Sequence, residues 1–256
     1  MNNTFKEILH SGQRLLGCFL QLPCLEVAEI YSNAGFDFLI IDNEHSVMDI
    51  PFSLNMIRAI AAVGGLSVIR TPDCEETTIK KTLDTGVDGI VLPGISSLAM
   101  MSKSMGFAKY APLGNRGACP CVRANKYGEG DTSFYSCANK KTAVIVQIEG
   151  KSALDELEAI LAVEGLDGII MGPVDLSMSL GVPGELNHPK VEQALQDILA
   201  ISGEKKIATG IFCMDLEETK KWFARGVNFV LYGIDSMFIR QHAYDTVKTL
   251  KAVARR

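Results

Sequence analysis

The sequence predicts an α/β protein, a single (β/α)8 TIM barrel that takes up residues 1–256. Three observations predict it: strand-like and helix-like segments alternate along the chain, no Pro-, Ser- or Gly-rich linker divides it, and one short pattern recurs four times. With 256 residues, 47% of them hydrophobic, the chain could bury its core in one barrel or in two smaller domains, and the unbroken alternation favours the barrel.

Eight short apolar runs are expected to form the strands. Most are nearly continuous Val, Ile and Leu, which is typical of parallel strands that are covered on both faces. Between them, apolar residues recur at helical spacing, as in residues 27–34 and 191–198. The predicted strands are Leu15–Leu22, Phe38–Ile41, Leu66–Arg70, Gly89–Leu92, Ala143–Glu149, Gly168–Met171, Lys206–Phe212 and Asn228–Tyr232.

The recurring pattern joins a helix to the next strand. "GFDFLII", "GVDGIVL", "GLDGIIM" and "GVNFVLY" precede the second, fourth, sixth and eighth strands and begin at Gly35, Gly86, Gly165 and Gly226. Each Gly stands where a helix end needs a left-handed residue, and the Asp or Asn two positions later turns the chain into the strand. Such joints also occur in doubly wound sheets, but the eightfold alternation favours the barrel.

The composition excludes several classes of protein. The net charge is -5 with both signs interspersed, so no nucleic-acid-binding surface is expected. The first residues lack a signal-peptide pattern and the apolar runs are of strand length, so no membrane segment is expected. Seven cysteines without framework spacing suggest reduced thiols, and these features together predict a cytoplasmic protein.

Polar residues follow several of the apolar strands. In a (β/α)8 barrel, the loops after the strands build the active site. Six side chains are therefore expected to converge on one mouth of the barrel: Asp42, Glu44, His45, Arg70, Glu149 and Asp175.

Glu149 and Asp175 form a candidate metal pair. They end the fifth strand and follow the sixth, and neighbouring carboxylates repel each other unless a proton or a cation lies between them. A hard divalent ion such as Mg²⁺ or Mn²⁺ prefers oxygen ligands and leaves positions for substrate oxygens. Gln147 shares the face of Glu149 and could orient a ligand. The alternative is that each acid pairs with a Lys or Arg, or that Asp175 caps a helix.

Arg70 and His45 are candidates for charge stabilisation and proton transfer. Arg70 could be an ion-pair partner for one of the acids, but a permanent charge at a strand end also suits stabilisation of an oxyanion. His45 is the only one of the four histidines that is expected at the mouth, and neighbouring acids suit a role as acid or base.

Asp84 is expected at the other end of the barrel. It lies in the last turn of a helix before Gly86, where the helix dipole disfavours a negative charge. One interpretation is that Asp84 is an exposed carboxylate whose unfavourable position costs little stability. A role at the active site would require that Asp84 reach the mouth of a neighbouring subunit.

Five segments resemble the HpcH/HpaI aldolase family: "DNEHS", "SVIRTP", "RGACPCVRANKYG", "VQIEGKSALDELEAILAVEGLDGIIMGPVDLSMSLG" and "GVNFVLYGIDSMF". The likeness runs from about residue 4 to residue 240 and keeps the order and spacing of the motifs. The family comprises class II pyruvate aldolases that act on 2-keto-3-deoxy sugar acids and 4-hydroxy-2-oxo acids. The resemblance therefore implies a lyase that cleaves such an acid to pyruvate and an aldehyde through an enolate. No Lys ends a predicted strand in a Schiff-base position, so a class I mechanism is not expected.

The resemblance also implies roles for individual residues. A divalent metal (Mg²⁺, Mn²⁺ or Co²⁺) would be held by Glu149 and Asp175 and chelated by the 2-oxo acid. Arg70 would stabilise the enolate oxygen, and His45 would be the acid or base, made more basic by Asp84 of an adjacent subunit. The implied catalytic residues are His45, Arg70, Asp84 and Asp42; those that bind pyruvate are Gln147, Gly172, Val174 and Asp175; and Glu44 supports His45 or a water, as Asp42 would also do.

Assembly and specificity are further implications. Family members are commonly hexamers, dimers of trimers with exchanged C-terminal helices, so a homo-oligomer is expected. The family usually has Gly at position 43, a small residue at 174 and an aliphatic residue at 212, where this chain has Asn43, Val174 and Phe212. The last two would narrow the pocket, so the aldehyde is expected to be small or differently oriented. The alternatives are a citrate-lyase-type lyase of CoA esters and a non-catalytic barrel that binds keto acids.

Overall fold

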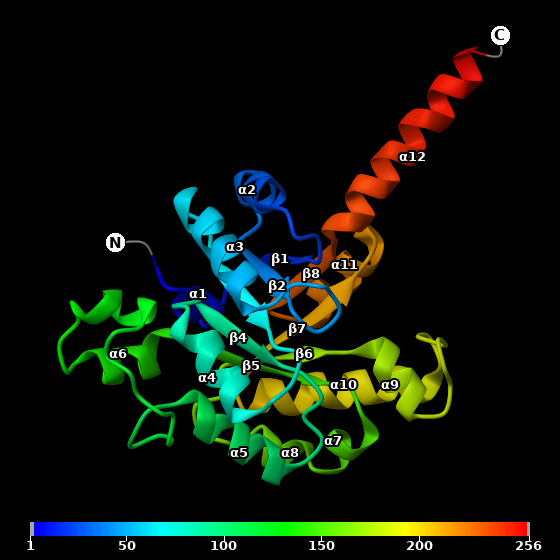
Figure 1. Ribbon diagram of the computed structural model, residues 1–256. Helices are drawn as coiled ribbons and strands as arrows, with labels where there is room; N and C mark the ends of the chain where they lie inside the picture. Colours follow the sequence, from blue (N-terminus) through cyan, green and yellow to red (C-terminus); the bar gives the residue numbers. More distant parts are fainter. Residues whose placement is uncertain (1–2, 255–256) are drawn as a thin grey trace.

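Eight parallel strands close into one barrel in the computed structural model, which describes residues 3–254 (Figure 1). Each strand pairs with its neighbours in chain order, and β1 pairs with β8. This confirms the predicted (β/α)8 fold; the first and last two residues of the predicted domain lie outside the described residues. The strands are β1 Leu15–Leu20, β2 Phe38–Asp42, β3 Ser67–Arg70, β4 Gly89–Leu92, β5 Ala143–Ile148, β6 Gly168–Met171, β7 Ala208–Cys213 and β8 Phe229–Ile234.

Helices cover the outside of the barrel, and α1 lies at its amino-terminal end. The helices are α1 Phe5–Leu9, α2 Leu25–Asn33, α3 Ile50–Ala62, α4 Glu76–Asp84, α5 Leu98–Ala108, the 3-10 helix η1 Arg123–Gly128, α6 Phe134–Lys141, α7 Lys151–Asp155, α8 Leu157–Ile160, α9 Pro173–Ser179, α10 Pro189–Glu204, α11 Leu216–Arg225 and α12 Asp235–Ala254. None of the helices within residues 3–254 has the length and apolar character that crossing a bilayer requires.

The predicted strand limits differ from the observed ones for local reasons. β1 stops at Leu20 because the next two backbone N–H groups, of Gln21 and Leu22, each donate to the buried carboxylate of Asp235 at 3.0 Å. β7 begins at Ala208 rather than Lys206, because Lys206 has a φ of 58° and cannot belong to an extended strand.

The recurring Gly-x-Asp/Asn joints connect β2, β4, β6 and β8 to the strand that precedes each of them in the chain. The four glycines all have positive φ, as predicted: Gly35 98°, Gly86 73°, Gly165 90° and Gly226 100°. Each Asp or Asn also accepts a backbone N–H at 2.7–2.9 Å from the beginning of the preceding strand: Asp37 from Leu16, Asp88 from Ser67, Asp167 from Val144 and Asn228 from Thr209. Three of the joints end a helix (α2, α4 and α11), whereas Gly165 lies past the turn that follows α8, so that part of the prediction is wrong there. In all four joints the Asp or Asn satisfies a backbone donor of the neighbouring strand.

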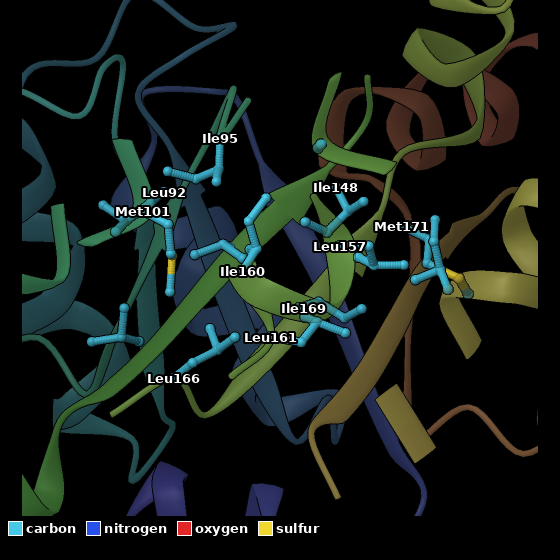
Figure 2. Close-up of a cluster of buried hydrophobic side chains, with 14 of the residues drawn as sticks. Leu92, Ile95, Met101, Ile148, Leu157, Ile160, Leu161, Leu166, Ile169 and Met171 are labelled. Carbon is cyan, nitrogen blue, oxygen red and sulfur yellow. The ribbon is translucent and has the colours of Figure 1, made fainter. Parts of the chain in front are cut away.

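Two apolar layers hold the barrel together. The interior contains aromatic side chains such as Phe38 and Phe229, whose rings lie 5.8 Å apart, and Phe5 of α1 packs on Phe38 from below. The outer layer lies between the sheet and the helices; Figure 2 shows part of it, where β4, β5 and β6 face α5 and α8. Both layers leave the carboxyl ends of the strands free for polar residues.

A buried ion cluster attaches α1 to the bottom of the barrel. The carboxylate of Asp167 lies 2.6 Å from Lys6 Nζ and 3.3 Å from His10 Nε2, both on or next to α1, and 4.0 Å from Lys109 Nζ. Lys109 is only 2% exposed, and its ammonium also donates to the carbonyls of Asn139 and Thr142. Burial lowers the pKa of Lys109 to about 8, although the charge of Asp167 raises it.

Replacing Lys109 with Met should remove a pH-dependent part of the stability. Because the pKa of Lys109 is lower in the folded chain (about 8) than its ordinary 10.5, the unfolded chain binds more protons between these values. Stability from this group therefore rises with pH across that window. The difference in unfolding free energy between wild type and Lys109→Met should shift by about 2 kcal/mol in favour of wild type from pH 7 to pH 10. Urea unfolding at both pH values measures it; an unchanged difference would contradict the prediction.

Candidate active site

A pocket of about 210 Å³ opens at the carboxyl ends of the strands. Its lining comes from β1, β3, β5, β6, β7 and β8 and from the loops that follow β2 and β6. Among the residues predicted at the site, six line it: His45, Arg70, Gln147, Gly172, Val174 and Asp175.

Arg70 is fixed at the centre of the site by Asp42. The two side chains end adjacent strands, β3 and β2, where Asp42 and Arg70 are paired in register. Arg70 Nε donates to Asp42 Oδ1 at 2.9 Å and Nη2 donates to Oδ2 at 2.7 Å, a two-point contact that sets the plane of the guanidinium. Arg70 is 6% exposed and Asp42 fully buried, so neither side chain is free to reorient.

The surroundings of Asp42 keep its carboxylate ionised. Burial raises its pKa, but the hydrogen bonds and charge of Arg70 lower it further than burial raises it, and the pKa lies below its ordinary value. Gln21 Nε2 donates to Oδ2 at 2.8 Å, and the backbone N–H groups of Glu44 and His45 donate to Oδ1. Asp42 therefore positions Arg70 and the start of the loop after β2; its carboxylate does not touch the His45 ring.

Glu44 lies between the arginine and the histidine. Its Oε2 is 3.1 Å from Arg70 Nη1 and 3.6 Å from His45 Nε2, yet it forms no hydrogen bond with any described residue. Burial raises the pKa of Glu44 above its ordinary value, although Arg70 and His45 act in the opposite direction. The His45 side chain is 60% exposed, so its ring is accessible from the mouth of the barrel.

Glu149 follows β5 and lies beside Gln147. Its Oε1 accepts the backbone N–H of Gly94 at 2.8 Å, and Gln147 Nε2 donates to its Oε2. Burial raises its pKa, the Gly94 hydrogen bond lowers it and the charge of Asp175 raises it again, so the pKa lies above its ordinary value. The other end of the Gln147 amide accepts from Arg70 Nη1 at 3.3 Å. Gln147 thus links the arginine to the carboxylate.

Asp175 is carried by the first turn of α9. The helix begins at Pro173 after Gly172, so Asp175 is its third residue and not the N-cap that was considered from the sequence. No Lys or Arg salt bridge to Asp175 or Glu149 is formed by the described residues. The alternative that these acids pair with a Lys or Arg is therefore wrong for the described residues.

The residues fit a hard divalent cation. Residues 3–254 contain no group of three or more His, Cys, Asp and Glu side chains that could hold a metal ion. Glu149 and Asp175 would therefore have to bind it with two carboxylates alone. Such a pair suits an ion that keeps water and leaves positions for substrate oxygens. Burial is the main cause of the raised pKa of Glu149, and the negative charge of Asp175 raises it further. Gly172 leaves the space beside them, because a Cβ there would lie 2.8 Å from Glu149 Cβ and 3.4 Å from Oε2.

Asp84 lies outside this pocket. It ends α4, and its Oδ1 accepts from Arg116 Nη2 at 2.6 Å within the same chain. The Arg116 guanidinium also lies 4.4 Å from the ring centroid of Tyr110. This pairing explains how the helix end tolerates the charge, and the predicted action of Asp84 on another subunit stays a prediction.

Several lining residues were not predicted. Phe19 and Ile234 form apolar parts of the wall, and Gln21 lines it where β1 ends. Gln21 could have been found, since it is a polar residue that ends an apolar run, like Arg70. Of the unusual residues noted in the sequence, Val174 and Phe212 line the pocket, whereas Asn43 is buried and accepts from Ser53 Oγ at 2.8 Å.

Comparison with known proteins gives a consistent result. The family model described as HpcH/HpaI aldolase/citrate lyase matches residues 15–242. A 2-keto-3-deoxy-L-rhamnonate aldolase of Salmonella paratyphi B is 33% identical over 254 residues, which cover 99% of this chain and 95% of that protein. An HpcH/HpaI aldolase/citrate lyase family protein of Burkholderia cenocepacia superposes with a TM-score of 0.93 at 30% identity, with 98% of this chain and 100% of that chain covered. A citrate synthase, SbnG, superposes with a TM-score of 0.89 at 27% identity, with 99% of both chains covered.

Proposed function

Because the chain belongs to the HpcH/HpaI aldolase/citrate lyase family, we propose that it is a class II aldolase that cleaves a 4-hydroxy-2-oxo acid to pyruvate and an aldehyde. The substrate would be a 2-keto-3-deoxy sugar acid or a dicarboxylic analogue. The name of the Salmonella relative supports the first of these classes. The observation that carries the proposal is the position of Arg70, which Asp42 holds in one pocket with His45 and Asp175 and which Gln147 links to Glu149.

The reaction requires the cleavage of one carbon–carbon bond and two proton transfers, one from the C4 hydroxyl and one to C3. A base removes the proton of the C4 hydroxyl, the C3–C4 bond breaks, and the aldehyde carbonyl forms at C4. The electron pair of the broken bond becomes the enolate of pyruvate, whose charge lies on the C2 oxygen, and a proton is then added at C3. His45 has an exposed ring at the mouth and suits the proton transfer.

Arg70 is suited to the charge that develops on the C2 oxygen. Its guanidinium is held in one plane before substrate arrives, so no reorganisation is needed when the charge appears. A divalent cation held by Glu149 and Asp175 would supply a Lewis acid to the same oxygen. Gln147 and the backbone at Gly172 and Val174, at the beginning of α9, would bind the pyruvate end.

Proton exchange at C3 of pyruvate in D₂O tests this function. The proposal expects exchange with added Mn²⁺, loss of exchange with EDTA, and recovery when Mn²⁺ is restored. Pyruvate binding without exchange under any metal would favour the non-catalytic alternative and would overturn the proposal. Acetyl-CoA or a CoA ester as the only reactive substrate would favour the citrate-lyase type.

Gly172→Ala should weaken metal binding. The new Cβ would lie 2.8 Å from Glu149 Cβ, so the Glu149 side chain must move. Gly172 has a φ of -104°, which Ala adopts without strain, so the effect would come from the displaced carboxylate. Mn²⁺ affinity by calorimetry should fall about 10–100-fold. Gly150→Ala is the control, since the nearest atom to its Cβ would be Ser152 Oγ at 3.8 Å. Equal affinity in both variants would contradict the proposed site.

We also propose a cytoplasmic homo-oligomer, a hexamer with exchanged C-terminal helices, that is built from a single-domain subunit. α12 extends away from the barrel (Figure 1), and among its described residues only Asp235 is buried. Its first turn is anchored by Phe238 against Tyr31 and Phe36. Beyond that turn, apolar side chains such as Val247 and Leu250 are 48% and 62% exposed, which supports packing against another subunit.

A double variant, Val247→Glu with Leu250→Glu, should reduce the molecular mass in solution. Charges buried against a partner would cost several kcal/mol each. Light scattering after size exclusion should show a smaller species than wild type, whereas Lys251→Glu on the same helix should leave the mass unchanged. An unchanged mass in the double variant would contradict helix exchange.

A further inference from the structure

The pocket has a polar side and an apolar side. The polar side chains of Arg70, Gln147 and Asp175 come from β3, β5 and the first turn of α9, and His45 adds a further polar group from the loop after β2. The opposite wall is built where β7, β8 and β1 lie next to one another in the closed barrel. That wall consists of Phe212, Ile234 and Phe19.

The apolar wall is continuous with the arginine. The rings of Phe19 and Phe212 lie 6.0 Å apart, and the Arg70 guanidinium lies 4.7 Å from the ring centroid of Phe19. Gln21 is the polar exception on this side, but its amide already donates to Asp42. Val174, which is 50% exposed, adds a further aliphatic surface from the first turn of α9.

The single guanidinium of the lining is already engaged. Arg70 is the only Lys or Arg among the described residues that line the pocket, and it binds both oxygens of Asp42 and lies near Glu44. If Arg70 binds a pyruvate oxygen and His45 serves the proton transfer, the described lining of this chain offers no further Lys or Arg to a second substrate carboxylate. An Arg116 that accompanied Asp84 from a neighbouring subunit would already be paired with that acid. An unpaired carboxylate against Phe19 and Phe212 would be costly.

We infer that the substrate tail beyond C4 is short, uncharged and apolar at its end, and that Phe212 is the residue that sets this specificity. The inference rests on the proposed function and decides between its two substrate classes, against the dicarboxylic analogue. The pocket volume of about 210 Å³ is also small for a ligand site, which favours a short tail.

Two matched substrates test the inference. 4-Hydroxy-2-oxopentanoate ends in a methyl group, and 4-hydroxy-2-oxopentanedioate has a carboxylate in the same position. With Mn²⁺ present and pyruvate release followed by NMR, kcat/KM should be at least about 100-fold higher for the methyl substrate. Equal values, or a preference for the carboxylate, would overturn the inference.

Phe212→Arg places a cation in the apolar wall and should reduce this preference at least about tenfold, because the added charge can pair with the substrate carboxylate. Met214→Arg is the matched control: it adds the same charge just past β7, at a residue that is 58% exposed and outside the pocket lining. The control should keep the wild-type ratio. If the ratio of the two kcat/KM values changes equally in both variants, Phe212 does not set the substrate specificity.

Phe212→Leu covers the case in which the arginine variant does not fold. It keeps the wall apolar and shortens it, so the preference for methyl over carboxylate should persist while 4-hydroxy-2-oxooctanoate gains relative to the pentanoate. No gain for the longer tail would contradict a limiting role of Phe212. Proton exchange of pyruvate distinguishes a failure of this inference from a failure of the proposed function. If exchange occurs but the carboxylate substrate is preferred, only the inference is contradicted. If no exchange occurs, both the proposed function and the inference are contradicted.

Discussion

Arg70→Lys should lower kcat/KM for retro-aldol cleavage by about 10²–10³-fold in a protein that stays folded. Lysine keeps the positive charge but has no planar group that could bind both oxygens of Asp42 and still reach Gln147, as Arg70 does. The loss should fall mainly on kcat, because the charge on the C2 oxygen develops only as the bond breaks.

Steady-state kinetics with the methyl-ended substrate, together with thermal unfolding, measure this effect. Arg58→Lys is a suitable control, since Arg58 is an exposed residue of α3 whose contact is with Asn55 on its own helix. A loss smaller than about threefold for Arg70→Lys would mean that the geometry of the guanidinium has no part in catalysis.

Asp42→Ala should have the largest effect on stability, about 3–5 kcal/mol, because it leaves the buried charge of Arg70 without its main partner. Urea unfolding at pH 7 measures it. The control is Asp155→Ala, which breaks an exposed pair with Lys151 and should cost less than about 1 kcal/mol.

The pH dependence of the same variant follows from the lowered pKa of Asp42. A carboxyl group whose pKa is depressed by folding stabilises the folded chain above its unfolded pKa, and this contribution is lost as pH falls through the folded value. The difference between wild type and Asp42→Ala should therefore be constant above about pH 5 and shrink in acid. A difference that grows as pH falls would contradict the ion pair.

Much of the fold can be predicted from local sequence because local chemistry decides it. Continuous apolar runs form strands that are covered on both faces, and three of the four glycine joints identify a helix end. The exact limits of the strands are harder to predict from the sequence, because they depend on groups that are distant in the chain. The end of β1 is set by Asp235, which lies more than two hundred residues away in the chain.

The same distinction between local and distant causes applies to the active site. The residues at strand ends could be placed at one mouth, because parallel strands bring their carboxyl ends together. The particular acid that Arg70 binds could not be predicted, since a choice among several carboxylates at one mouth leaves no local signal. Asp42 binds the Arg70 side chain, Asp84 binds Arg116, and Phe19 faces Phe212 from the other side of β8.

The most direct test of the account is a crystal grown with Mn²⁺ and pyruvate, read by anomalous scattering. The account predicts one manganese peak bound by a carboxylate oxygen of Glu149 and one of Asp175, with pyruvate oxygens on the metal and the C2 oxygen within hydrogen-bond distance of Arg70. Pyruvate in the pocket with the two carboxylates turned apart and no peak between them would contradict it.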